Sequence, residues 1–363
     1  MRNERILRFV ALYNWARVVI IIAAVLMGAV ALCAQTTLDK CTPELHGVVR
    51  GKYEYSPDMD ASRFELRNAR ISVEGRLPMR TDYKVEIDLC DEGQIKMKDA
   101  WVRLSPWRSL RVSVGNQRLP FSIDAHRNPY AQYFANRSFI AKQVGDVRDI
   151  GVMGGYDFKD SNGNTRLKID AGMFNGSNIS TQKYAWHGDI CYSARAQYSP
   201  TRNIMVVPSV LHTAIADRKA SYTSIDCGAY YESKWVHLEA EYLHKSYSNN
   251  SFNDCNAMNA MVIVRHPMRR AADYVKSVSW LARYDYMDDH ADGSQGGGNE
   301  VTQKLKVTDY ARHRMTLGVT LGLCDKGTPV LLRLNYEKYW YLNGGTAKEG
   351  EHDKLVAEVA VKI

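Results

Sequence analysis

Between Arg118 and Arg148 the chain combines basic groups with aromatic rings and shows no regular apolar period. Guanidinium groups match the oxygens of small anions such as phosphate, and rings of Arg or Lys around an opening favour anions. Loops of this length usually have a function, although scattered charge on an ordinary surface loop is the alternative. The basic residues are Arg118, Arg127, Arg137, Lys142 and Arg148, and the rings are Phe121, Tyr130, Tyr133, Phe134 and Phe139.

The sequence offers little that would support catalysis, a metal site or a cofactor. No Gly-x-Ser-x-Gly motif occurs, and the ten His residues lie in no recognisable triad context. The stretch 288–293 resembles a calcium loop only faintly, because the downstream Glu is missing. No Cys-x-x-Cys pair is present, so we expect neither metal nor cofactor. Basic residues on alternate strand positions also form no nucleic-acid-binding stripe, and we expect no nucleic acid partner.

The elements that must position residues 118–148 are strands, because apolar residues recur with a period of two. In one example Tyr83, Val85 and Ile87 alternate with Lys84 and Glu86. The pattern predicts about sixteen strands, near 46–55, 63–75, 81–90, 96–104, 109–117, 149–158, 164–174, 190–199, 203–212, 223–232, 234–247, 257–265, 273–286, 308–323, 329–340 and 353–363.

The lengths of these strands and of their connections indicate a membrane barrel. About ten tilted residues cross a bilayer, whereas strands of soluble sandwiches are typically about five or six residues long. Even-numbered strands lead into short turns such as "SPWRS" and "SPTR", and odd-numbered strands mostly lead into longer polar segments such as 287–307. This layout is typical of outer-membrane barrels. We therefore predict an all-β fold, a sixteen-stranded antiparallel transmembrane β-barrel over residues 46–363.

The start of the chain predicts export. Residues 1–34 combine a basic region, the apolar run 18–31 and small residues near Ala34, which is the pattern of a signal peptide; a permanent membrane anchor is the alternative. Residues 35–45 form a short lead into the barrel. The predicted location is the outer membrane of a Gram-negative bacterium, where the barrel contacts the lipid bilayer.

In such a barrel the apolar face points to lipid and the polar face lines the interior. Arg67 is ambiguous, because the alternation slips between Phe64 and Ala69, as at a β-bulge. Acidic residues share the inner face, so a balanced, water-facing wall is the alternative to a selective one. The predicted inward basic residues are Arg50, Lys52, Arg70, Lys84, Arg103, Arg111, Lys168, Arg195, Arg283, Arg312, Arg314 and Arg333.

A sixteen-stranded barrel encloses a channel too wide to discriminate small solutes. A long loop folded inward after the fifth strand would narrow it, and residues 118–148 are placed to form this third loop. We expect its aromatic rings to pack against the wall and its guanidinium groups to face the opening.

Three segments carry a family resemblance. Residues 62–75 include an Arg-rich strand, 98–122 run from Lys-Asp-Ala-Trp through Val-Gly-Asn-Gln into Arg-Leu-Pro-Phe, and 134–138 read "FANRS". These segments resemble the phosphate-selective porin O and P family. The resemblance implies a sixteen-stranded outer-membrane barrel, usually trimeric, with the third loop in the pore. Asn116 is inserted relative to the family pattern, so the loop geometry is expected to differ from that of the phosphate-specific relatives.

The resemblance implies that the constriction loop contributes Arg118, Arg127, Arg137 and Lys142 to the pore. Arg67 and Arg70 correspond to the Arg-rich second strand that faces the loop. The expected function is an outer-membrane porin, not an enzyme, that forms a water-filled channel for passive diffusion of small solutes. The solutes would include anions such as phosphate, and the assembly would be a homotrimer. A structural or adhesive outer-membrane barrel with an occluded pore is the alternative.

If the loop cations set the selectivity, Arg118→Ala combined with Arg137→Ala shifts the reversal potential of the channel toward cations. The measurement is a planar bilayer recording in a salt gradient. A double variant with the selectivity of the unmodified protein would mean that these two residues do not lie at the constriction.

Overall fold

The computed structural model describes residues 43–363 except 92, 146, 177–178, 185, 187–189, 216–219, 269–273, 293–304 and 326–327. The predicted signal peptide, residues 1–34, lies outside the described residues, as does most of the predicted lead, residues 35–45.

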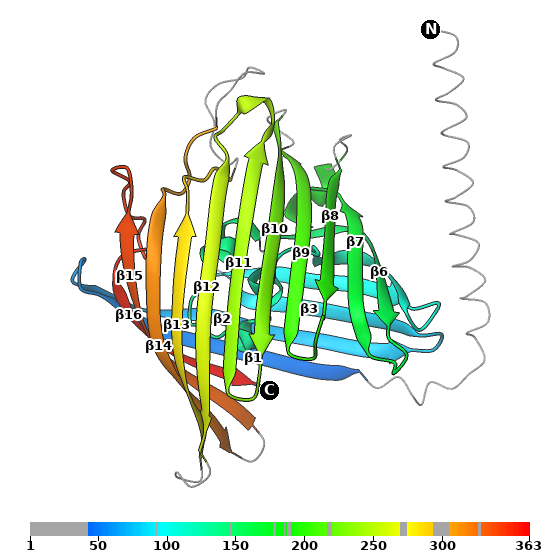
Figure 1. Cartoon of the computed structure of the whole chain (residues 1–363), viewed down its shortest axis with the longest axis horizontal. Coiled ribbons are helices and arrows are strands. Elements are labelled where there is room, and N and C mark those ends of the chain that lie inside the picture. Colours follow the sequence, from blue (N-terminus) through cyan, green and yellow to red (C-terminus); the bar gives the residue numbers. More distant parts are fainter. Residues whose placement is uncertain are drawn as a thin grey trace.

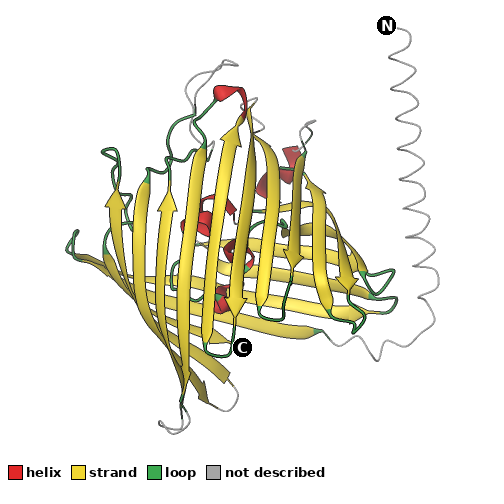
Figure 2. Cartoon of the chain, viewed as in Figure 1, coloured by secondary structure: helices red, strands yellow, loops and turns green. Residues whose placement is uncertain are grey.

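The described chain forms a closed antiparallel barrel of sixteen strands, as predicted (Figures 1 and 2). Each strand pairs with its neighbours in sequence, and β1 closes the barrel against β16. The strands are β1 (Glu44–Ser56), β2 (Ala61–Leu77), β3 (Thr81–Asp91), β4 (Gln94–Leu104), β5 (Leu110–Arg118), β6 (Arg148–Lys159), β7 (Thr165–Phe174), β8 (Cys191–Tyr198), β9 (Ile204–Ile215), β10 (Ala220–Glu232), β11 (Val236–Tyr247), β12 (Cys255–Pro267), β13 (Val275–Met287), β14 (Arg312–Asp325), β15 (Thr328–Tyr341) and β16 (Lys354–Lys362).

The largest difference from the predicted strands lies before β14. The period of two predicts a strand from residue 308, whereas β14 begins at Arg312. Residues 308–311 instead pair within their own loop, where Asp309 forms an isolated bridge with His290. The backbone N–H of Ala311 donates to the Asp289 carboxylate at 2.7 Å. These local partners replace the ladder partners that a longer strand would need.

Apolar side chains cover the outside of the barrel, and charged side chains fill its inner face. Leu317, Leu334 and Leu355 are about half exposed on the outer surface, whereas Arg314 and Arg333, on the same strands, are almost completely buried. This arrangement is the reverse of a soluble protein and suits a barrel whose outer face meets lipid. None of the helices in the described part of the chain is long and apolar enough to cross a membrane.

The predicted irregularity near Arg67 is a β-bulge. The register between β1 and β2 shifts after Arg50, which pairs with Asn68, and Gly51 then pairs with Leu66. Arg67 is therefore the extra residue, and the shift explains why the sequence alternation slips at this point.

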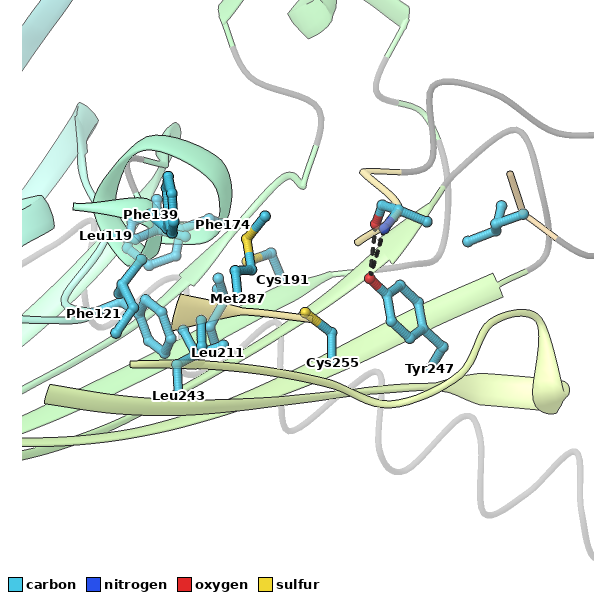
Figure 3. Close-up of a cluster of buried hydrophobic side chains, with 14 of the residues drawn as sticks. Leu119, Phe121, Phe139, Phe174, Cys191, Leu211, Leu243, Tyr247, Cys255 and Met287 are labelled. Atoms are coloured by element: carbon cyan, nitrogen blue, oxygen red, sulfur yellow. Dashed lines mark hydrogen bonds between the residues drawn. The ribbon is translucent and has the colours of Figure 1, made fainter. Parts of the chain in front are cut away.

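Residues 119–147 connect β5 to β6 and contain the short helices η3 (Asp124–His126), η4 (Pro129–Ala131) and η5 (Ile140–Gly145). Their apolar side chains are buried against inner-face residues of the strands (Figure 3). Leu119, Phe121 and Phe139 pack in one cluster with Leu211 of β9 and Leu243 of β11. A second cluster joins Phe134 to Met261, Ile263 and Leu281. The expected packing of the loop rings against the wall is therefore present for these three phenylalanines.

The end of β5 depends on Gly115. Its backbone has φ of +130°, a conformation that residues with a side chain rarely adopt. A Cβ atom here would lie 2.2 Å from the carbonyl oxygen of Ala100 on β4. Asn116, the inserted residue, follows directly and donates from its side chain to the carbonyl of Lys98 at 2.7 Å. Gly115 and Asn116 together allow the backbones of β4 and β5 to approach closely just before the chain leaves the barrel wall.

We expect Gly115→Ala to destabilise the barrel by about 2–6 kcal/mol, since overpacking and backbone strain each cost roughly 1–3 kcal/mol. Gly154→Ala is the matched control, because the nearest atom to a Cβ there is 3.9 Å away. The measurement is the temperature at which the folded form, seen by its electrophoretic mobility, is lost. Equal temperatures for the two variants would contradict the role assigned to Gly115.

Candidate functional site

Buried arginines on the inner wall hold the backbone of the loop between β5 and β6. Arg50 of β1 donates to the carbonyl of Ala135 at 2.8 Å. Arg314 of β14 donates to the carbonyl of Arg137 at 2.7 Å. Arg283 of β13 and Arg333 of β15 make four further bonds of this kind, to the carbonyls of residues 130, 132, 136 and 137. Four guanidinium groups thus satisfy carbonyls that water would otherwise solvate.

Carboxylates on the same or neighbouring strands pair with these arginines, one carboxylate to two guanidinium groups. Glu358 of β16 accepts from Arg50 at 2.6 Å and also bonds Arg333. Asp285 of β13 accepts from Arg283 and Arg314, both at 2.8 Å. Each of these arginines thus has a carboxylate and a loop carbonyl as acceptors, which makes its burial tolerable and holds the loop. Because two arginines share each carboxylate, part of their positive charge is balanced by the dipoles of the loop carbonyls.

The start of the loop is held by Glu241 of β11, two strands along the wall from β13. Its carboxylate accepts from the Ser122 hydroxyl and from the backbone N–H of Ile123, both at 2.6 Å. The N–H of Asp124 lies 3.4 Å from the second oxygen. Ser122 has φ of +65°, an uncommon value for a residue with a side chain. The Glu241 carboxylate therefore stabilises a turn that the backbone alone would not favour.

Arg127, predicted to face the opening, is instead part of this anchor. Its guanidinium donates to Asp124 at 2.8 Å and to Glu239 of β11 at 2.9 Å. Asp124 also accepts from the Ser138 hydroxyl at 2.8 Å. Burial alone would raise the pKa of the Asp124 carboxyl. The positive charges of Arg127 and Arg283 outweigh burial and lower this pKa to about 2. The Asp124 carboxyl is therefore ionised above about pH 4. The stabilisation that its negative charge gives to the anchor is lost only as the pH falls toward 2.

The other predicted site residues are spread over the lumen and do not form one cluster. Arg70 pairs with Glu86 at 3.0 Å and Asp88 at 2.9 Å. Lys142 pairs with Glu351 at 2.5 Å, and Arg67 lies 3.9 Å from Glu65. Arg118 donates to the carbonyl of Arg127 at 3.2 Å. The carbonyl of Arg137 accepts from two wall arginines.

A cavity of about 220 Å³ lies between Arg118 and the inner faces of β4, β5, β7 and β8. We call it the basic recess. Its basic lining residues outnumber its acidic ones; they are Arg103, Arg111, Arg118, Lys168 and Arg195, against Asp99 and Asp170.

Pairing inside the basic recess is incomplete. Arg111 bonds Asp157 at 2.6 Å and Asp170 at 3.2 Å, so its charge is neutralised. Within the described residues, by contrast, no carboxylate lies within 4 Å of the guanidinium groups of Arg103 and Arg195. Arg103 stacks on the Trp101 ring, with its guanidinium carbon 4.3 Å from the ring centroid. These two arginines are the positive charges of the recess that the protein leaves available.

His126 adds no positive charge to the recess. Burial lowers the pKa of its imidazole well below the ordinary value, and the nearby Arg195 and Arg118 lower it further. The neutral ring donates from Nε2 to the carbonyl of Leu119, at 2.7 Å.

A second cavity, of about 280 Å³, lies beside β1–β3. Its Lys84 pairs with Glu74 at 2.8 Å and with Glu86 at 3.1 Å, so the positive and negative charges of its lining are more nearly equal.

Sequence parity placed Arg103 and Arg195 on the inner face but did not single them out. Their opposite residues are acidic, since Arg103 pairs in register with Asp82 and Arg195 with Asp170. In the folded barrel Asp82 instead bonds Arg76, and Asp170 bonds Arg111. Register alone would have suggested neutral pairs at both positions.

Among the described residues, no three His, Cys, Asp or Glu side chains are grouped to hold a metal ion.

Comparison with known proteins identifies a family and a fold. The family model described as phosphate-selective porin O and P matches residues 46–258. Among solved structures, the anion-selective porin from Comamonas acidovorans superimposes with a TM-score of 0.59 at 15% identity, covering 89% of this chain and 99% of that one. The trimer form of OmpT from Vibrio cholerae superimposes with a TM-score of 0.57 at 12% identity, covering 89% of this chain and 99% of that one. OmpF of Salmonella typhi, in complex with daunomycin, superimposes with a TM-score of 0.58 at 13% identity, covering 90% of this chain and 99% of that one. No curated protein matches the sequence.

The Glu241 contacts predict that Glu241→Ala loosens the loop. Each loop donor left without its acceptor costs about 1–3 kcal/mol, so anchoring weakens by on the order of 3 kcal/mol. Glu74→Ala is the matched control, because Glu74 lies on the same inner face and pairs with Lys84. The measurement is the noise of the open-channel current, together with protease cleavage between residues 119 and 147.

We expect a noisier current and faster cleavage for Glu241→Ala only. Traces and cleavage rates that match those of Glu74→Ala would show that Glu241 does not anchor the loop.

Proposed function

The chain belongs to the phosphate-selective porin O and P family, and from this premise we propose that its channel favours small anions such as phosphate. The chain is a porin of the Gram-negative outer membrane, a closed barrel that forms a water-filled channel for small solutes. Family membership indicates a channel and not an enzyme. The preference for anions and the residues that produce it are the proposal.

The observation that carries the proposal is the unequal pairing of charges along the inner wall. Most buried cations, such as Arg70 and Arg127, form ion pairs with carboxylates and contribute little to the electrostatic potential in the channel. Arg103 and Arg195 in the basic recess have no such partner in the described part of the chain. Positive charge that no carboxylate neutralises raises the local concentration of anions, and low-dielectric walls strengthen the effect.

Passage through the recess requires weak and exchangeable binding. A guanidinium replaces part of the hydration that a small anion loses in a narrow opening. Two arginines with Lys168 close by offer successive donors, so an anion can move from one to the next. Asp170 in the same recess limits the depth of the well, and an anion can therefore leave as readily as it enters.

The residues predicted from the sequence have two roles in this proposal. Arg118 lines the basic recess and acts on the anion directly. Arg67, Arg70, Arg127, Arg137 and Lys142 shape the constriction, because the loop from 118 to 148 narrows the lumen and their contacts help to fix the wall and the loop.

We further propose that the mature chain, after removal of residues 1–34, assembles as a homotrimer. Support for the trimer comes from the similar barrel of Vibrio cholerae OmpT, which is described in a trimer form. The small solutes that enter each channel would be the remaining partners, in addition to the bilayer.

Arg103→Ala combined with Arg195→Ala should lower the ratio of chloride to potassium permeability by more than about fivefold, the effect expected from the loss of one charge. This estimate follows because a unit charge 4 Å from an ion contributes roughly 1 kcal/mol in water. The measurement is the reversal potential in a potassium chloride gradient, repeated with potassium phosphate. Lys159→Ala with Arg166→Ala is the matched control, because both side chains are exposed at the barrel rim and neither lines the basic recess.

An unchanged ratio in the Arg103/Arg195 variant would remove the basic recess from the conduction path. An unmodified protein that inserts into the bilayer without conducting would support the alternative, a structural or adhesive barrel with an occluded pore.

A further inference from the structure

The short turns of the barrel repeatedly place a basic residue beside a large apolar one. Met79 and Arg80 are adjacent between β2 and β3, and Trp107 and Arg108 between β4 and β5. Lys234 precedes Trp235 between β10 and β11. The turn between β8 and β9 carries Arg202, close to the exposed Tyr198 at the end of β8. We call Arg80, Arg108, Arg202 and Lys234 the basic collar.

All four collar side chains are exposed. Within the described residues, no carboxylate forms an ion pair with any of them, although the same rim holds the pairs Arg76–Asp82 and Arg166–Asp160. The collar is therefore not part of the charge network that neutralises the rest of the barrel. Its charges are available to a partner outside the chain.

The apolar neighbours fix the depth of the collar in the membrane. Trp107 is 67% exposed and Trp235 48%, and the Trp235 ring lies 6.5 Å from that of His266 on the neighbouring strand β12. Aromatic rings of this kind lie at the boundary between hydrocarbon and headgroups. Lys234 stays close to that boundary, since its Nζ atom lies 5.1 Å from the Trp235 ring centroid. Basic side chains one residue away from such rings, as Arg108 and Lys234 are, can reach the headgroup phosphates.

The opposite rim has a different charge. Its described loops expose several carboxylates and four lysines, Lys142, Lys183, Lys306 and Lys348. Of these, Lys142 pairs with Glu351 and Lys348 with Asp309. Positive charge at headgroup depth is therefore concentrated on the short-turn side, which is the periplasmic side in outer-membrane barrels. The exposed carboxylates of the long loops include Asp58, Asp60, Asp254, Asp292 and Glu349.

We propose that the basic collar binds the headgroups of anionic phospholipids in the inner leaflet of the outer membrane. The guanidinium fork matches the phosphate oxygens, and the adjacent Met or Trp packs on the first carbons of the acyl chains. Four turns around the rim contribute, so the sites are distributed around the barrel and face lipid. This function is separate from conduction, because none of the four residues lines the basic recess.

The test compares Arg80→Ser/Arg108→Ser with the matched variant Lys183→Ser/Lys306→Ser, which removes the same charge from the long-loop side. Detergent-solubilised protein is titrated with phosphatidylglycerol, and separately with phosphatidylethanolamine, and bound lipids are counted by native mass spectrometry. Each basic residue near an anionic surface strengthens binding about fivefold. We expect the collar variant to bind phosphatidylglycerol at least tenfold more weakly, while phosphatidylethanolamine binding and single-channel conductance stay unchanged.

The Lys183/Lys306 variant should bind both lipids as the unmodified protein does. The proposal is overturned if the collar variant keeps its preference for phosphatidylglycerol, or if the two variants lose it equally. It is also overturned if the collar variant keeps lipid binding but no longer retains an acidic periplasmic protein that the unmodified barrel carries, since the partner would then be a protein.

Discussion

A chain that crosses lipid must satisfy every backbone N–H and C=O group within itself, and the rest of this structure depends on that constraint. The ladder from β1 to β16 meets it by closing, which leaves no free edge. Closure fixes the alternation of each strand, so apolar side chains face lipid and charged ones face inward. The interior thereby receives buried arginines such as Arg50 and Arg333, each less than 3% exposed. Such charges are tolerated only where carboxylates and carbonyls surround them.

The loop between β5 and β6 supplies those carbonyls. Its backbone would be costly to bury without donors, and the wall arginines would be costly to bury without acceptors. Arg283 and Arg314 meet both needs by donating to the carbonyl of Arg137, while Asp285 pairs with both guanidinium groups. The basic recess lies where this exchange is incomplete. Its positive character follows from carboxylates that serve other arginines.

The sequence predicts the barrel well because strand alternation and turn composition are local properties. It also predicts that Phe121 and Phe139 pack on the wall, because rings in a polar loop need an apolar contact. It could not predict which arginines are neutralised. Glu239 lies 112 residues from Arg127, and Glu241 lies 119 residues from Ser122, so no local pattern links them. Asp82 and Asp170 show that register misleads too, because long side chains reach past their direct partners to Arg76 and Arg111.

The anchoring of the loop also bears on how selectivity can arise. Phe121, Phe139 and Leu243 are at most 1% exposed, in a cluster that joins the loop to several strands. Moving the loop would expose this apolar surface and would break the ion pairs of Arg127 at the same time. A segment held by both kinds of contact has a high free energy of local opening. The anion preference proposed above would therefore come from a fixed arrangement of charges, that is, from the arginines that the wall leaves unpaired, and not from movement of the loop.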